Sequence, residues 1–514
     1  MSAAPPYSLL TRGPRTRTRI GGNDDLVSLI APEVGIYLLC TIVCSALWAT
    51  GGALAVTMIA PIVLTVTPAV ANFLMVRRDR NMLVSALFAF RLAIMVFLGL
   101  GGLYDSFAPE EVRHPTDWVL YATTQDEAAK VFVVWLVGMT LTMAGAAVAM
   151  KASTGVDTEI RAGAEQGRAS WQVAALAWLV TFSIDSRFGI GQSLGTSGGM
   201  PTSFYSLLTA VELTSLFFLG RTMDQSRGSK VVCAVAALAS IVVGLLLQNK
   251  SIVIAPMLIV VLGYLSARFT TKRVLIGTAV LVTTFVQINP VVIYARDRQS
   301  RDYGELGGGS LSERAGYISD YLAGDRTDRT AETNVMDRLN YVMPASFVIA
   351  QFDNGVPNDE LAGSAYMLVP RFLWPEKPIT TGAGLKVNLL MGIESVNQIA
   401  VTVFADIYWN LGWAGLLLTF VMGAFLGASS VVSQTIMRNG DWLMMPFVLG
   451  TFRVALGADG NFTAGILIPA VLCIALYWVL RLGRLVLAAR HSGSSRGLLG
   501  RLQSRPSAEL QVPQ

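Results

Sequence analysis

The run "VGIYLLCTIVCSALWATGGALA", Val34 to Ala55, decides the class of fold because it contains no charged side chain. A helix rises about 1.5 Å per residue, so roughly 20 such residues cross the hydrocarbon core of a bilayer. A second apolar run, 57–76, follows almost without a break and stops at Arg77 and Arg78. The chain therefore opens with two membrane-spanning helices.

The same pattern continues through most of the 514 residues, of which 53% are hydrophobic and 14% charged. Soluble chains carry about 25% charged residues, so this composition is typical of a membrane protein. We expect an all-α polytopic membrane protein with about 12 transmembrane helices. The predicted spans are 34–55, 57–76, 82–103, 131–150, 171–186, 202–220, 231–248, 252–267, 274–292, 411–433, 442–458 and 464–482.

The basic residues predict the orientation. If the N-terminus is cytoplasmic, more than half of the 39 Lys and Arg residues fall in cytoplasmic connections and tails, as the positive-inside rule requires. Both termini are then cytoplasmic. The predicted parts are a basic tail at 1–33, helices 1 to 9 within 34–292, one large periplasmic loop at 293–410, helices 10 to 12 within 411–482, and a second basic tail at 483–514. Only the tails have the composition of disordered segments.

Several functional classes are excluded. The net charge of +5 comes from basic connections between apolar runs, which favours membrane topology and no nucleic acid partner. The four cysteines lie inside apolar runs without the spacing of metal ligands, and no outer loop carries an Asp-x-Asp pair. We therefore expect neither a metal nor a cofactor.

Ionisable side chains within or beside the spans are costly and are candidates for function. Arg91 and Glu212 lie mid-span and either form a structural ion pair with each other or take part in binding. Cations outward of mid-membrane would suit a diphosphate, because Arg binds phosphate oxygens through two hydrogen bonds. These cations are Arg187, Lys250, Arg371, Lys377 and Arg453.

The large outer loop contains "YMLVPRFLWPEKP", Tyr366 to Pro378, in which three prolines exclude a regular helix. With "DRLNY" at 337–341, "GSAYMLVPRFLWPEKP" at 363–378 and "FADIYWNLGWAGLLL" at 404–418, it resembles the Wzy-type oligosaccharide repeat-unit polymerases of O-antigen and exopolysaccharide synthesis. Elsewhere the resemblance is architectural, namely many spans and a late periplasmic loop. One departure is Asp406, where the family pattern leads us to expect Glu.

The resemblance implies an inverting glycosyl transfer at the outer face of the bacterial inner membrane. The donor would be a polyprenyl-diphosphate-linked oligosaccharide and the acceptor a second such repeat unit, with a chain-length regulator and a flippase as candidate partners. Arg371 would act in catalysis, with Glu376 as first and Asp406 as second candidate for the base that an acceptor hydroxyl needs. The diphosphate or glycan would be bound by Arg91, Arg187, Lys250, Arg338, Lys377, Arg453 and Tyr408.

Other interpretations stay open at this level. Glu376 could instead form a local ion pair with Lys377 or Arg371, and Trp374 could anchor the loop at the membrane surface rather than stack on a sugar. An O-antigen ligase resembles the polymerases but uses a histidine in its large loop, and no histidine lies between Val292 and Asn410. A transporter would favour broken helices and an internal repeat, and the two halves of the chain look unlike each other.

Overall fold

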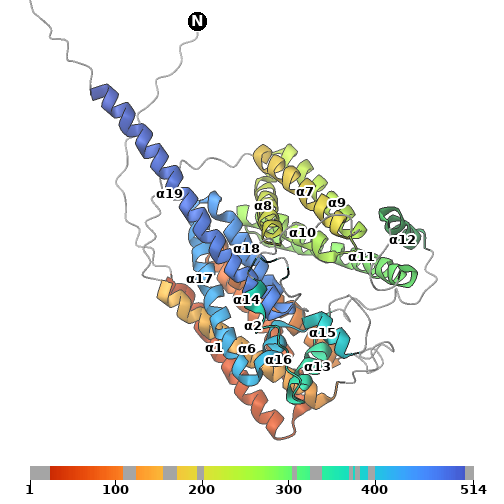
Figure 1. The fold of residues 1–514 in the computed structure, drawn as a ribbon. Coiled ribbons are helices and arrows are strands. Elements are labelled where there is room, and N and C mark those ends of the chain that lie inside the picture. The colour runs from red at the N-terminus through yellow and green to blue at the C-terminus, as the bar shows by residue number, and fades with distance from the viewer. Residues whose placement is uncertain are drawn as a thin grey trace, which may run out of the picture.

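The computed structural model describes residues 23–107, 123–153, 171–193, 202–303, 310–324, 339–367, 369, 374, 376, 383–391 and 400–503. Every regular element within these residues is helical, and the helices form two neighbouring bundles (Figure 1). Large apolar side chains point outward from both, with Leu39, Phe73, Leu238 and Leu417 all more than half exposed. Such a surface is suited to lipid, as the composition predicts.

The larger bundle is built around α6, a helix that is mostly enclosed by its neighbours. It packs against α1, α2, α16 and α17. The elements of this bundle are α1 (Asn23–Ala49), α2 (Ala53–Arg78), α3 (Ala86–Ala93), a π-helical segment (Ile94–Leu100), α4 (Gly101–Phe107), α6 (Gln125–Ala152), α17 (Leu417–Asn439), α18 (Met445–Leu456) and α19 (Ile468–Gln503).

Close contact between α6 and α17 depends on glycine. A Cβ atom on Gly145 would lie 2.0 Å from the carbonyl oxygen of Phe420, and one on Gly423 would lie 1.9 Å from that of Thr142. No larger residue fits at either position without moving the helices apart. Small residues at the crossing let two membrane helices gain van der Waals contact, which drives association where both partners are as apolar as lipid.

The smaller bundle holds α7 (Trp171–Ser193), α8 (Thr202–Thr222), α9 (Arg227–Leu246), α10 (Lys250–Ala267) and α11 (Thr271–Tyr303), followed by α12 (Leu311–Ala323). Helix α10 packs against α8, α9 and α11. The two bundles meet where α8 contacts α18.

Four short helices gather at one end of the larger bundle, which we call the loop end. They are α13 (Val342–Asp353), α14 (Ser364–Met367), α15 (Ala383–Leu390) and α16 (Val403–Gly415); in Figure 1, α13, α15 and α16 lie towards the lower end of the larger bundle and α14 is drawn above them. Polar contacts at this end join neighbouring elements: Asn340, just before α13, donates to Asp105 of α4 at 2.8 Å, and Trp48 of α1 donates to Asp126 of α6 at 2.8 Å.

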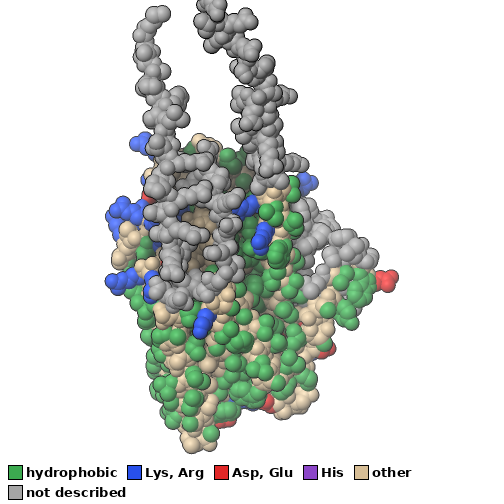
Figure 2. Space-filling model, turned by 90° about the vertical axis from the view of Figure 1, so that its left-hand side faces the viewer, with side chains coloured by type: hydrophobic (Ala, Val, Ile, Leu, Met, Phe, Trp, Pro, Cys, Tyr) green, Lys and Arg blue, Asp and Glu red, His purple; other side chains and the backbone are tan. Residues whose placement is uncertain are grey.

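The opposite end, which we call the basic end, holds the connections rich in Lys and Arg. There Arg438 pairs with Asp79 at 2.8 Å, and the Arg221 guanidinium lies over the Trp442 ring. Figure 2 shows Lys and Arg side chains towards one end of the molecule, acidic side chains at the other, and a broad hydrophobic surface between them. The described part of the chain thus has two chemically distinct ends.

Eight helices among the described residues are long and apolar enough to cross a membrane, at the predicted spans 1 to 4, 7, 9, 10 and 12. Spans 5, 6 and 8 correspond to α7, α8 and α10. The predicted span 442–458 corresponds to α18 together with the 3-10 turns Trp442–Met444 and Gly457–Asp459 that flank it directly.

Segment limits also differ from expectation. Helix α1 begins at Asn23 and α19 runs to Gln503, so both segments predicted as tails are partly helical. Helix α11 continues to Tyr303, beyond the predicted loop start at 293.

Candidate functional site

Asp406 is the centre of a buried polar network at the loop end. It lies in the first turn of α16, is fully buried, and accepts hydrogen bonds from the Phe462 amide at 2.8 Å and from Asn358 and Asn410 at 3.3 Å each. Burial, together with the negative charge of Glu360, raises the pKa of Asp406 to about 7, although the three donors oppose this shift. The carboxyl group is therefore poised to change protonation near neutral pH.

Glu360 is the second acid of this network. Its side chain is buried and accepts from the Ala383 amide at 2.9 Å and from the Asn461 side chain at 3.1 Å. Burial raises its pKa above the ordinary value, and the hydrogen bonds partly offset that effect. Two buried acids that influence each other electrostatically are a common feature of functional sites.

The network closes the segment that carries the predicted motif. Glu360 and Ala383 flank residues 361–382, and their hydrogen bond holds the two flanks together. Lys386, one turn further along α15, reinforces the closure by donating to Asn358 at 3.2 Å and pairing with Asp359 at 2.8 Å. The segment with Arg371, Glu376 and Lys377 thus begins and ends on the Asp406 network.

Residues directly before α16 and after α18 complete the base of the site. Thr402 has φ 67° and ψ 145°, which a β-branched residue rarely adopts. Its amide donates to the carbonyl oxygen of Asp459 at 3.1 Å, and its hydroxyl accepts from the Trp135 indole at 3.1 Å. Such an unfavourable conformation persists only where surrounding contacts impose it, and it is more frequent at functional sites than elsewhere.

A second acid-containing group lies on the other side of α16. The Tyr408 hydroxyl donates to Asp353 of α13 at 3.0 Å, and Lys130 of α6 pairs with the same carboxylate and lies 5.4 Å from the centre of the Tyr408 ring. Burial and the nearby carboxylate raise the pKa of Tyr408. This group fixes α13 and α16 against α6.

Of the predicted site residues, Asp406 and Tyr408 both lie on α16 at the loop end, on opposite sides of that helix and in separate polar groups. Glu376 and Trp374 are both exposed, and Trp374 packs edge-on against Tyr366 with the ring centres 5.5 Å apart. Arg338, Arg371 and Lys377 lie outside the described residues.

Four predicted cations lie in the bundles. Arg91 is buried and donates from Nε to Glu33 at 3.1 Å, so its partner is Glu33 rather than the expected Glu212. Lys250 donates to Asn289 between α10 and α11. Arg187 of α7 is exposed, and Arg453 of α18 is exposed within electrostatic range of Glu212. These four cations therefore make different contacts, and in the described part of the chain they do not meet at one shared site for a diphosphate.

No family model matches the chain, and no curated protein or solved structure does. Assignment of function rests on the motif residues and on the geometry just described.

Sequence reasoning did not identify several members of the network, namely Asn358, Glu360, Lys386, Asp459 and Asn461. The available signal was local. "NDEL" at 358–361 directly precedes the motif segment, and "DGNF" at 459–462 joins two apolar runs. The polar residues of these two connecting segments could have been predicted to meet at the loop end of the bundle.

Proposed function

We propose that the chain is a Wzy-type oligosaccharide repeat-unit polymerase, a metal-independent inverting glycosyltransferase of the bacterial inner membrane. The resemblance over 337–418 motivates the proposal. The observation that supports it best is the Glu360–Ala383 hydrogen bond, because it brings the two flanks of the segment that contains Arg371 together at a pair of buried acids. A closed loop with a rigid base is suited to holding a bulky glycan near a membrane surface.

In this proposal the loop end faces the periplasm. The basic end then faces the cytoplasm, where Lys and Arg are enriched in membrane proteins. Both termini are cytoplasmic, and the polyprenyl-diphosphate headgroup of the substrate meets α13 to α16 at the outer surface of the membrane.

The reaction would transfer a glycan from diphosphate to a sugar hydroxyl. The acceptor oxygen attacks the anomeric carbon from the face opposite the diphosphate, the bond from that carbon to the phosphate oxygen breaks, and the configuration inverts. Arg371 and Lys377 stabilise the negative charge that develops on the leaving diphosphate. The acceptor proton passes to a carboxylate.

Exposure distinguishes the two candidate bases. Glu376 is exposed and can reach a substrate, whereas Asp406 is fully buried and already accepts from Phe462, Asn358 and Asn410. We assign the proton transfer to Glu376. Asp406 is a positioning residue that fixes α16 and the base of the loop.

The test is polymerisation by the purified full-length chain in detergent. Its substrate is a polyprenyl-diphosphate-linked repeat unit extracted from cells of the same source that lack this chain. The expected product is a ladder of lengthened lipid-linked glycans. Arg371→Ala should give single units only, whereas Arg481→Ala, which replaces an exposed cation on α19, should polymerise normally.

Three results would overturn the proposal. Normal lengthening by Arg371→Ala would remove that residue from the site. Transfer of the glycan only to an acceptor without a polyprenyl chain would indicate a ligase. Absence of lengthening by folded protein, with movement of the lipid across reconstituted vesicles, would indicate a transporter.

A further inference from the structure

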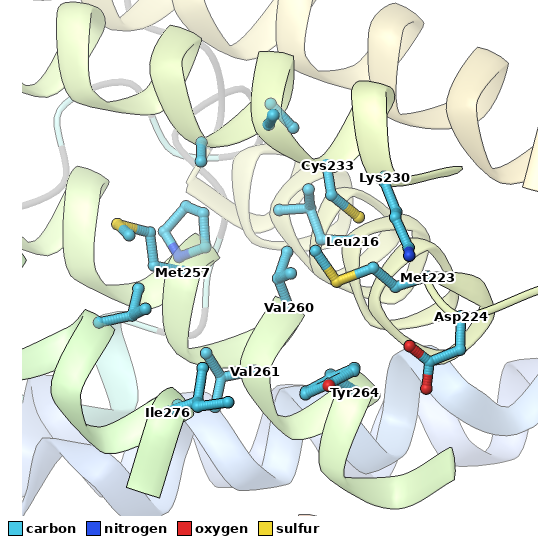
Figure 3. A pocket seen from close by; sticks show the side chains of 16 residues that line it. Leu216, Met223, Asp224, Lys230, Cys233, Met257, Val260, Val261, Tyr264 and Ile276 are labelled. Atoms are coloured by element: carbon cyan, nitrogen blue, oxygen red, sulfur yellow. The ribbon is translucent and has the colours of Figure 1, made fainter. Parts of the chain in front are cut away.

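A cavity of about 340 Å³ lies in the smaller bundle, between α8, α9, α10 and α11 (Figure 3). Most of its wall is apolar. Polar side chains occur together on one side, where Lys230, Asp224 and Tyr264 lie, and Met257 and Ile276 line the other side (Figure 3). The cavity is therefore amphipathic along its length.

The cavity extends parallel to the helices. On α9 its lining runs from Lys230 to Ala237, and on α10 from Tyr264 to Met257. Lys230 lies in the first turn of α9, beside Arg227, so the polar end of the cavity lies at the basic end of the molecule. Seven residues of α-helix span roughly 10 Å, so the apolar end of the cavity lies towards mid-membrane. A slot with this direction matches the orientation of a lipid chain.

The cavity is open to the hydrocarbon region on one side. Ile276 and Val280 of α11 line it and are 46% and 43% exposed. Leu238, next to the lining residue Ala237 on α9, is 61% exposed on the outer surface. A lipid chain can thus enter sideways from the bilayer.

The charge at the polar end favours an anion. Arg273 pairs with Asp224 and also stacks on the Tyr264 ring, 4.4 Å from its centre, so the one acid of the lining is neutralised. Lys230 is exposed, and Arg227, one turn earlier on α9, adds a further cation. The cytoplasmic leaflet is rich in anionic lipid, and basic pockets between membrane helices on that side bind lipid headgroups.

We propose that this cavity binds one anionic phospholipid, with an acyl chain in the apolar slot and the headgroup phosphate on Lys230. The site lies at the opposite end of the molecule from the Asp406 network and does not depend on the proposed glycosyl transfer. Its occupancy fills the space between α9 and α11 and stabilises the smaller bundle.

The test uses native mass spectrometry and thermal unfolding of the purified full-length chain in detergent. The probes are phosphatidylglycerol, phosphatidylcholine with the same acyl chains, a polyprenyl phosphate, and glycerol phosphate without acyl chains. We expect one retained phosphatidylglycerol and a rise in the unfolding temperature that phosphatidylcholine and glycerol phosphate do not reproduce. Lys230→Gln should weaken phosphatidylglycerol binding about fivefold, the effect of one surface cation.

Matched variants test the slot itself. Ala237→Phe fills the cavity and should abolish the retention of phosphatidylglycerol. Leu238→Phe enlarges the adjacent outward-facing side chain and should leave phosphatidylglycerol retention unchanged. Arg481→Gln, which removes an exposed cation from α19, is the control for Lys230→Gln. Equal binding of phosphatidylcholine, preference for the polyprenyl phosphate, binding of glycerol phosphate alone, or undiminished phosphatidylglycerol retention by folded Ala237→Phe would each overturn the proposal.

Discussion

The Glu360 carboxylate accepts a hydrogen bond of 2.9 Å from the amide of Ala383, so residues that flank a 22-residue segment meet at its base. Glu360 is buried, and Asn461 holds its other oxygen at 3.1 Å. The hydrogen bond from Asn461 joins the base of the motif segment to the turn between α18 and the last spanning helix, and the hydrogen bond from Ala383 joins the two flanks of the segment. It also explains how a segment with three prolines can be held at both ends.

Ala383→Pro removes that hydrogen bond selectively. Ala383 is the first residue of α15, a position where proline is tolerated because its missing N–H needs no partner within the helix. Glu360 then loses a buried donor, which we expect to cost about 1–3 kcal/mol. The unfolding temperature should fall, and tryptic cleavage after Arg371 should be faster.

Ala383→Gly is the matched control because it retains the amide N–H. Trypsin should cleave this variant after Arg371 at nearly the wild-type rate, once the loss of stability caused by glycine itself is taken into account. Equal cleavage rates for wild type and Ala383→Pro would show that the hydrogen bond does not hold the segment.

Asp406→Asn tests the buried acid through pH. The folded chain raises the pKa of Asp406 from 3.8 to about 7, so the folded state holds the proton more tightly than the unfolded state between these values. The favourable contribution of Asp406 to the free energy of unfolding is fully present below pH about 4 and is lost as the pH rises towards about 7. Wild type should therefore lose stability relative to Asp406→Asn over this range.

The measurement is the difference in unfolding temperature between the two proteins from pH 4 to pH 8. A constant difference would mean that Asp406 titrates at its ordinary value in the folded chain, and a difference of opposite slope would mean that its pKa is lowered.

The larger features of the fold could be predicted from sequence because each depends on local composition. A long apolar run specifies a membrane helix by itself, and charged connections alternate between the two ends. The limits of α1 show where this reasoning fails. Pro32 and Glu33 were interpreted as lying outside the first span, but α1 begins at Asn23 and passes through both. Glu33 is tolerated inside because Arg91 of α3 pairs with it.

The Asp406 network could not be predicted in the same way. Glu360 and Asn461 are 101 residues apart in the chain, and their contact depends on how α16 packs against α6 and against the turn that follows α18. Asp406 and Tyr408 were found because they lie in a motif of recognisable order. Their partners are Asn358, in the connection after α13, and Asp353, the last residue of α13, and the position of both is set only by the assembled bundle.

Tyr408→Phe tests the contact between α16 and α13. The ring keeps its edge-on contact with Phe352, whose centre is 5.3 Å away, and only the hydrogen bond to Asp353 is lost. We expect a loss of about 0.5–1.5 kcal/mol in the free energy of unfolding. A double-mutant cycle with Asp353→Asn measures the coupling, and additive effects of the two changes would contradict a direct interaction.

The pair Arg91 and Glu33 gives a test of whether Arg91 binds substrate or supports the bundle. Arg91→Met leaves the Glu33 carboxylate buried without its partner, and breaking a buried pair in this way costs about 3–5 kcal/mol. The double variant Arg91→Met with Glu33→Gln has no buried charge left to compensate, so it should recover most of that stability. Because the contact is structural, we also expect the double variant to lengthen lipid-linked repeat units as wild type does. Recovery of the unfolding temperature without recovery of polymerisation would instead place the Arg91 charge in substrate binding.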